Sequence, residues 1–95
     1  MILLTYDVNT ASESGARRLR MVAKACEAYG LRVQKSVFEL DLDPAQLVAL
    51  KGRLSDIIDV EQDSIRLYNL GANWKRRIEV LGRTPRIGSE ELLIL

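Results

Sequence analysis

The sequence predicts a single α+β domain, and three observations lead to this fold class. Segments rich in β-forming residues alternate with two amphipathic helical segments, in the order strand, helix, strand material, helix, strand. The length of 95 residues suits one domain. A hydrophobic fraction of 47% is ample for a packed core, and it leaves apolar residues to spare for an oligomer interface.

The first part of the chain predicts a strand followed by a helix. Residues 1–8 begin as a continuous apolar run, which is typical of a central strand covered on at least one face. A polar loop follows, in which Ser12 or Ser14 can cap a helix. Over residues 15–29, apolar residues recur at helical spacing and form one stripe. Gly30 is expected to end this helix in a left-handed conformation.

The middle of the chain predicts further strand and a second helix. Residues 31–42 are rich in β-formers but long for one strand of a small domain, so they leave room for a tight turn near residues 35–36. The pair Asp43-Pro44 is typical of a helix start, because Asp caps the first turn and Pro suits its first position. Leucines and isoleucines at helical spacing carry this helix to about Asp59.

The remaining segments complete a ferredoxin-like arrangement. Residues 64–70 alternate apolar and polar side chains, as in a half-buried strand, and residues 78–81 are also strand-like. This order of elements fits an α+β sandwich with two helices on one face of an antiparallel sheet. The domain is expected to span residues 1–82. The segment 83–95 is too short to be a domain, and its apolar end, 92–95, could cover the bare face by adding an edge strand, for example to a partner subunit.

Charge is segregated along the chain although its net value is only +1. Residues 39–63 are acidic on balance, and a second basic block follows Trp74. The first basic block, residues 16–35, holds six bases and one acid; the bases are Arg17, Arg18, Arg20, Lys24, Arg32 and Lys35. Such segregation favours a nucleic-acid partner, because guanidinium groups make bidentate contacts with phosphate. A solvated helix face is the alternative interpretation.

Composition excludes several chemistries. There is one cysteine, Cys26, and no histidine, so an internal disulfide, a zinc site and histidine-dependent nucleophiles are not expected. Cys26 lies on the apolar stripe of its helix and is expected to be buried and inert. The N-terminal run lacks a positive leader, and no stretch approaches the ~20 apolar residues of a membrane span. We therefore expect a cytoplasmic protein with no membrane contact.

Asp7 is the residue that most directly suggests chemistry. It ends the first strand, and a carboxylate there could bind Mg²⁺, which often takes one or two carboxylates and keeps its waters. Two copies brought together by a two-fold axis would make a more credible site than one. A turn or helix cap is the alternative role. Tyr6 points to the opposite side of the strand, where it could stack on a base or pack in the core.

The basic helix and the strand material after it supply candidate nucleic-acid contacts. Arg17, Arg20 and Lys24 fall together on the side opposite the apolar stripe, and Arg18 lies at its border. Three residues of the next segment could also take part, Arg32 by binding phosphate, Ser36 by bonding a ligand and Phe38 by stacking. Their alternatives are a solvated base, a turn residue and a core residue.

Four segments together carry a resemblance to a known family. They are residues 4–8 (LTYDV), 17–20 (RRLR), 29–39 (YGLRVQKSVFE) and 63–68 (DSIRLY). In order, spacing and chain length they resemble the second universal CRISPR-associated protein, and the resemblance covers nearly the whole chain. It implies a ferredoxin-like fold in which residues 31–42 form a hairpin, and a homodimer packed sheet to sheet, with the C-terminal strand crossing to the partner.

The resemblance also implies function. Members of the family act as metal-dependent nucleases on RNA or DNA, and they form a complex with the CRISPR-associated integrase during spacer acquisition. Asp7 matches the family's metal-binding acid. The functional basic and aromatic positions of the family match Arg18, Arg20, Arg32 and Phe38, with Ser36 in the same motif.

Two hypotheses follow, from different functional classes. In the first, one Mg²⁺ shared by Asp7 of both subunits activates a water molecule against a phosphodiester, while the arginines hold the backbone. In the second, the dimer is a non-catalytic scaffold that grips duplex DNA through its phosphates and bridges the integrase. A small regulatory module that binds a metabolite is a third interpretation, which the charge segregation disfavours.

Overall fold

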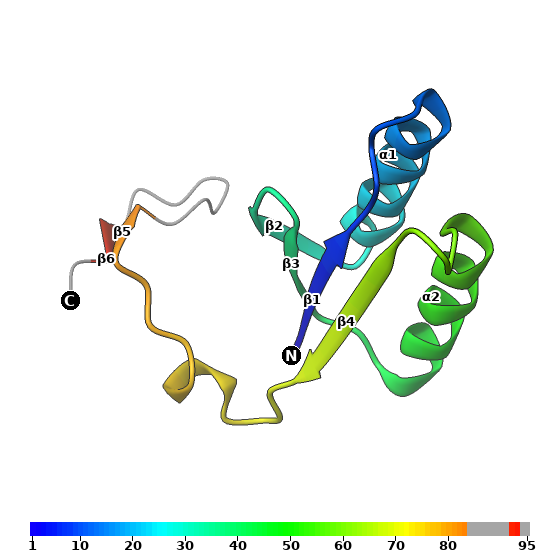
Figure 1. Cartoon of the computed structure of the whole chain (residues 1–95). Coiled ribbons are helices and arrows are strands. Elements are labelled where there is room, and N and C mark those ends of the chain that lie inside the picture. Colours follow the sequence, from blue (N-terminus) through cyan, green and yellow to red (C-terminus); the bar gives the residue numbers. More distant parts are fainter. Residues whose placement is uncertain (84–91, 94–95) are drawn as a thin grey trace.

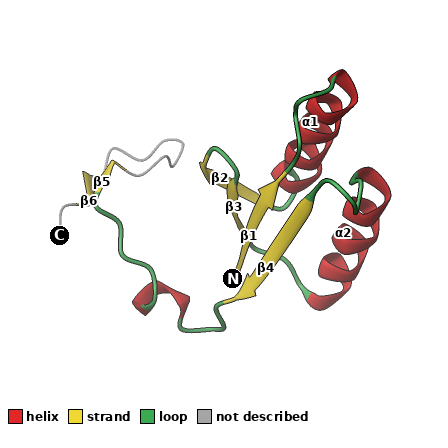
Figure 2. Ribbon diagram, in the orientation of Figure 1, coloured by secondary structure: helices red, strands yellow, loops and turns green. Residues whose placement is uncertain are grey.

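The computed structural model describes residues 1–83 and 92–93, and its main body has two layers (Figure 1). Four strands form one antiparallel sheet in the order β2-β3-β1-β4. Both α-helices lie on the same side of this sheet (Figure 2). The strands are β1 (Ile2–Asp7), β2 (Gly30–Gln34), β3 (Val37–Leu40) and β4 (Ser64–Asn69), and the helices are α1 (Glu13–Glu27) and α2 (Pro44–Ile57). The predicted ferredoxin-like α+β fold is confirmed.

The core lies between the sheet and the helices. Alternate residues of β1 are buried, with Leu4 fully inaccessible to solvent, and its cross-strand neighbours are Phe38 on β3 and Leu67 on β4. Val22 and Cys26 of α1 are buried against this layer, as the apolar stripe predicted. Because strand side chains alternate, the intervening residues of β1, β3 and β4 project from the other face, which α1 and α2 leave uncovered.

Both helices begin at side-chain caps. The Ser12 hydroxyl accepts a hydrogen bond from Gly15 N at 3.1 Å, so α1 starts two residues earlier than the spacing predicted. At α2, the Asp43 carboxylate accepts from Gln46 N and the Gln46 side chain accepts from Asp43 N, at 2.8 and 2.9 Å. This reciprocal capping box, with Pro44 in the first turn, confirms the predicted helix start.

Gly30 does not have the role that the sequence predicted. It is the first residue of β2, and the only glycines with positive φ among the described residues are Gly71 and Gly82. The helix instead ends at Ala28 in a right-handed conformation. A Cβ atom on Gly30 would lie 2.0 Å from the Glu39 carbonyl oxygen, so glycine is required here by the close approach of two strands.

Residues 31–42 divide into two strands, as the family resemblance implied. β2 and β3 are joined by a turn at Lys35 and Ser36, and the pairing shifts by one residue between Arg32 and Gln34. The turn is tied to the central strand, because Tyr6 N donates to the Ser36 carbonyl at 3.1 Å. The hairpin therefore reaches the same end of the sheet as Asp7.

The C-terminal part differs most from expectation. Residues 78–81 form no strand; the short helix η1 (Trp74–Arg76) is followed by an irregular run. Gly82 begins β5 (Gly82–Arg83), which pairs with β6 (Leu92–Leu93) in a separate two-stranded ladder. The predicted strand at 92–95 is thus found at 92–93, and residues 94–95 lie outside the described residues. Figure 1 shows β5 and β6 on the side of the sheet away from the helices.

Within residues 1–83 and 92–93, none of the helices has both the length and the apolar character that crossing a membrane requires.

Candidate functional site

Asp7 is exposed at the end of the uncovered sheet face. It is the last residue of β1, and it lies on the same face as Leu3 and Thr5. Its cross-strand neighbour is Ser64, the first residue of β4, which is also exposed. Tyr6 is buried on the helix side, so the predicted opposition of the Tyr6 and Asp7 side chains is confirmed. A carboxylate in this position is open to solvent, to a cation or to a second copy of the chain.

The backbone beside Asp7 is held by a buried acid, Asp63. The Asp63 side chain is fully buried, and it accepts hydrogen bonds from Asn9 N at 3.0 Å and from Asp59 N at 2.9 Å. The Arg18 Nε donates to the same carboxylate at 2.7 Å. Burial by itself would raise the pKa of Asp63, but these hydrogen bonds from Arg18, Asp59 and Asn9 lower that pKa below its ordinary value. Asp63 is therefore a carboxylate anion around neutral pH.

Arg18 is engaged inside the protein. Its Nε and one terminal nitrogen donate to Asp63, the second at 3.4 Å, and its other terminal nitrogen lies 3.4 Å from the Ser14 hydroxyl. Only 14% of its side chain is exposed. The predicted phosphate contact from Arg18 receives no support from this geometry, because the guanidinium already has an anionic partner.

Among the described residues, the other bases of α1 have no such partner. Arg17, Arg20 and Lys24 are exposed on the outer side of the helix, opposite its buried residues, as predicted. They point away from the sheet, whereas Asp7 projects from the far side of the sheet. The fold of one chain therefore does not bring Asp7 and this basic helix face into one continuous surface.

Arg32, Phe38 and Tyr6 form a stack on the helix side of the sheet edge. The Arg32 guanidinium lies 5.3 Å from the centre of the Phe38 ring, and the Phe38 and Tyr6 rings are 6.1 Å apart. The Tyr6 hydroxyl donates to the Lys35 carbonyl at 3.2 Å, and burial raises the Tyr6 pKa. Phe38 is completely buried, so its ring holds the exposed Arg32 and is not presented to solvent.

Ser36 lies in the β2–β3 turn, where it is half-buried. Its carbonyl accepts the hydrogen bond from Tyr6 N described above, so its backbone links the hairpin to the strand that carries Asp7. Ser36 therefore lies at the Asp7 end of the sheet, in the turn position that was the alternative interpretation of this residue.

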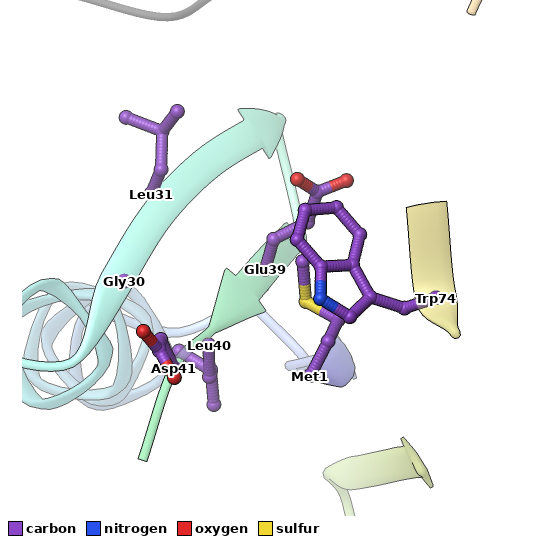
Figure 3. Close-up of a pocket in the computed structure, with 7 residues that line it drawn as sticks. All are labelled: Met1, Gly30, Leu31, Glu39, Leu40, Asp41 and Trp74. Carbon is purple, nitrogen blue, oxygen red and sulfur yellow. The ribbon is translucent and has the colours of Figure 1, made fainter. Parts of the chain in front are cut away.

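The uncovered sheet face is partly apolar. Leu3, Leu31 and Val37 are half-buried there, and Glu39 lies beside Leu3 and Leu31 in the strand register. Burial raises the pKa of Glu39. A groove of about 310 Å³ opens at the end of the sheet opposite Asp7, lined by Met1, Gly30, Leu31, Glu39, Leu40, Asp41 and Trp74 (Figure 3). The nearby Lys75 amine lies 5.7 Å from the Trp74 ring centre.

One chain supplies few ligands for a metal ion. Across residues 1–83 and 92–93, no group of three or more acidic, cysteine or histidine side chains is placed to hold one. Asp7 alone offers a solvent-open carboxylate at the predicted position, which suits a hard cation that keeps most of its waters. The donor set fits Mg²⁺ only if a second carboxylate comes from another copy of the chain.

Sequence reasoning missed Asp63 as part of this site. The residue belongs to a recognised motif, but its partner Arg18 is 45 positions away along the chain. The available signal was a single acid directly before the last core strand, and many acids in turns have that position.

Taken together, the fold and the site define a small ferredoxin-like protein with an acid at the end of its first strand and a basic outer helix face. Proteins of this class are compatible with nucleic-acid binding. Residues 1–78 match the family described as CRISPR associated protein Cas2, and the chain belongs to that family.

Individual relatives agree with this assignment. The chain is 59% identical over 95 residues, the full length of both proteins, to CRISPR-associated endoribonuclease Cas2 3 of Rhodospirillum rubrum. It is 52% identical over 94 residues to CRISPR-associated endonuclease Cas2 of Halalkalibacterium halodurans, covering 99% of this chain and 98% of that protein. The structure of Streptococcus pyogenes Cas2 at pH 6.5 superposes with a TM-score of 0.78 at 58% identity, covering 85% of this chain and 98% of that one.

Proposed function

We propose that this protein is a dimeric, metal-dependent endonuclease of CRISPR adaptation, which cleaves phosphodiester bonds of RNA or DNA in the cytoplasm. The observation that carries the proposal is the exposed Asp7 carboxylate at the end of an uncovered, partly apolar sheet face. Relatives over the full chain are named as an endoribonuclease and an endonuclease, which supports the same reaction class.

The proposed dimer packs sheet to sheet, so that two copies of Asp7 approach across the two-fold axis. Each subunit would contribute one carboxylate oxygen ligand to a shared Mg²⁺, and the C-terminal strand would cross to the partner. When bound, Mg²⁺ supplies a water of lowered pKa and neutralises charge on the scissile phosphate. Asp7 is the ligand in this proposal; the chain offers no histidine that could act as general base.

The remaining site residues would bind and support the nucleic acid. Arg17, Arg20 and Lys24 are exposed and suited to phosphate oxygens, which they would contact without reading sequence. Arg32 would contact the backbone from the sheet edge, oriented by the Phe38 ring beneath it. Beneath that pair, Tyr6 supports the stack, and the Ser36 backbone holds the hairpin against β1.

A second candidate function is a non-catalytic scaffold that grips duplex DNA and bridges the CRISPR integrase during spacer capture. One observation favours it: the exposed bases of α1 point away from the sheet face that carries Asp7. A duplex held on the outer helix faces would then not need to reach Asp7 at all. In this function Asp7 has a structural role at the subunit interface.

A paired cleavage and binding assay separates the two functions. Wild type, Asp7→Ala and the control Asp56→Ala, which removes an exposed acid of α2, are incubated with single-stranded RNA and duplex DNA in Mg²⁺ or Mn²⁺. A gel shift with each substrate reports binding by the same proteins. The nuclease predicts cleavage that requires metal, is lost only in Asp7→Ala and leaves binding largely intact.

Two results would decide against the nuclease. Equal background cleavage in all three proteins, with duplex binding retained, would leave the scaffold as the function. Cleavage that persists in Asp7→Ala at the wild-type rate and is removed by a chelator would show a metal site elsewhere, and would refute the role of Asp7.

A further inference from the structure

We propose that Asp63, acting with Arg18, is the positioning residue for the Asp7 carboxylate. The inference rests on the proposed metal site at Asp7, and it gives a role to Asp63, which the proposed function does not use. Asp63 does not touch the substrate or the cation. Its carboxylate holds the backbone at Asn9, two residues after Asp7, and so sets where two Asp7 side chains meet.

Asp63 is linked to Asn9 by a hydrogen bond, and along the chain to Ser64, the cross-strand neighbour of Asp7. Its Oδ1 accepts from Asn9 N at 3.0 Å, and Asn9 is only two residues beyond Asp7. In the other direction, Asp63 is followed at once by Ser64, which pairs with Asp7 in the β1–β4 ladder. The carboxylate therefore anchors the end of β1 and the start of β4 at the point where Asp7 leaves the sheet.

Both oxygens of Asp63 are needed for this anchor. Oδ1 serves Asn9 N, while Oδ2 serves Arg18 Nε at 2.7 Å and Asp59 N at 2.9 Å. All of these partners are donors. An asparagine has one acceptor oxygen and one NH₂ group. The oxygen is expected to take the position of Oδ2, which serves two donors, so the NH₂ group would face Asn9 N and that contact would be lost. Asparagine at 63 is thus a nearly isosteric way to remove half of the anchor.

Asn9 is also held from its other side. The Asn9 carbonyl oxygen approaches α1 so closely that a Cβ atom on Gly15 would lie 1.9 Å from it. The segment between Asp7 and α1 therefore lies between the Asp63 carboxylate and the first turn of the helix. Arg18 extends from that helix to complete the charge pair, so the loop, the helix and β4 are joined at one buried point.

The consequence concerns metal affinity more than folding. A cation shared by two exposed carboxylates is bound well only when both carboxylates are already in place. A loosened Asp7–Asn9 segment would leave the sheet and the core intact but would spread the Asp7 carboxylate over many positions. Groups that orient a ligand in this indirect way affect metal binding strongly, typically by about tenfold or more when they are changed.

The test measures Mn²⁺ binding to the nucleic-acid-free protein by calorimetry and electron paramagnetic resonance. It compares wild type, Asp7→Asn, Asp63→Asn and the control Asp43→Ala, which removes the capping carboxylate of α2 and has no contact with the site. Asp63→Asn is expected to weaken Mn²⁺ binding about tenfold. The Asn9 amide of Asp63→Asn should also exchange faster in hydrogen-exchange measurements. Asp43→Ala should keep wild-type Mn²⁺ affinity even if its melting temperature falls as much as that of Asp63→Asn.

A milder variant guards against loss of folding. Arg18→Lys keeps the charge beside Asp63 but removes the fork of two donors, and it should weaken Mn²⁺ binding in the same direction by a smaller factor. Mn²⁺ affinity within twofold of wild type in both Asp63→Asn and Arg18→Lys would overturn the inference while leaving the metal site standing. Wild-type affinity in Asp7→Asn would instead refute the metal site itself, and the inference with it.

Discussion

At the scale of single residues, the buried pair of Asp63 and Arg18 links stability to pH. Hydrogen bonds lower the pKa of Asp63 below its ordinary value, so the unfolded chain binds a proton there more readily than the folded one does. The contribution of this carboxylate to stability is therefore complete above its ordinary pKa of about 3.8 and is lost as the pH falls through the lower folded value. The pair should support the acid limb of the stability curve.

We expect Asp63→Asn to remove this part of the pH dependence. At pH 7 the variant should lose about 1–3 kcal/mol of unfolding free energy, because one of the groups that donate to the buried Asp63 carboxylate is left without an acceptor. As the pH falls through the lowered pKa of Asp63, the difference from wild type should shrink, since wild-type Asp63 then becomes protonated as well. Urea unfolding at a series of pH values measures both. Asp56→Asn, which changes an exposed acid, should show neither effect, and a constant difference at all pH values would contradict the linkage.

At this scale the sequence predicted features that depend on residues close together in the chain, and missed a contact between residues far apart in it. Strand alternation is local, so it correctly set Tyr6 inside and Asp7 outside. The same logic placed Cys26 on the buried stripe, where burial raises its pKa to about 11. The partner of Arg18 is 45 residues away, and its choice depends on how α1 and the start of β4 are brought together by the whole fold.

At the scale of elements, two glycines of similar sequence appearance have opposite structural demands. A Cβ atom on Gly30 would lie 2.0 Å from the Glu39 carbonyl oxygen and 2.8 Å from Leu40 Cα, both of which are backbone atoms that cannot move aside. A Cβ atom on Gly52, inside α2, would meet nothing within 4 Å. Steric contact between β2 and β3 therefore decides the effect of a substitution at Gly30, whereas helix propensity decides it at Gly52.

The pair of variants should shift stability in opposite directions. Gly30→Ala is expected to cost about 1–3 kcal/mol, because the strands must separate to admit a methyl group. Gly52→Ala is expected to stabilise the protein by about 0.5–1 kcal/mol through the lower entropy of alanine in the unfolded chain and its better helix propensity. Chemical denaturation at pH 7 measures both values. A gain in stability for Gly30→Ala would show that the two strands are not held at the close separation seen here.

Element prediction succeeded where a local signal marks the start of a helix. The Asp43-Pro44 start of α2 and the polar loop before α1 are such signals, and both were interpreted correctly. The strand expected at 78–81 failed because β-propensity describes how a side chain fits a sheet and says nothing about where a pairing partner lies. In the described part of the chain, those residues have no neighbouring strand to complete a ladder.

At the scale of the whole molecule, two faces of different character lie on opposite sides of the structure. The outer side of α1 is basic, with Arg17, Arg20 and Lys24 exposed, while the uncovered sheet face carries Asp7 among apolar residues. Charge segregation along the sequence predicted the first face, and the apolar surplus predicted the second. The sequence could not show that the sheet separates them, because the side on which α1 packs is a property of the assembled fold.

The basic face should dominate the salt dependence of duplex DNA binding. The logarithm of the affinity falls as the logarithm of the salt concentration rises, and each phosphate contact that is lost makes this slope less steep by about 0.9. Replacing Arg17, Arg20 and Lys24 together by alanine should therefore flatten the slope and weaken binding at low salt. The control replaces Lys51 and Arg53, exposed bases of α2, and should leave the slope almost unchanged. Equal slopes for both multiple variants would mean that DNA lies elsewhere on the protein.

The uncovered sheet face is where the proposed homodimer can be tested independently of catalysis. Val37 projects from this face, half-buried, and pairs with Thr5 next to Leu3. A carboxylate introduced there would be forced into an apolar interface in each subunit, and desolvating it would cost several kcal/mol per ion. Val37→Glu should therefore be monomeric in sedimentation at concentrations where wild type is dimeric.

The matched control is Val48→Glu, because Val48 is 71% exposed on α2, away from the sheet face. It adds the same charge without entering the proposed interface, and it should remain dimeric. A monomeric Val37→Glu should also bind Mn²⁺ more weakly than wild type, since each separated subunit retains only one Asp7 carboxylate. If Val37→Glu stays dimeric, the subunits associate through another surface, and two copies of Asp7 have no reason to meet.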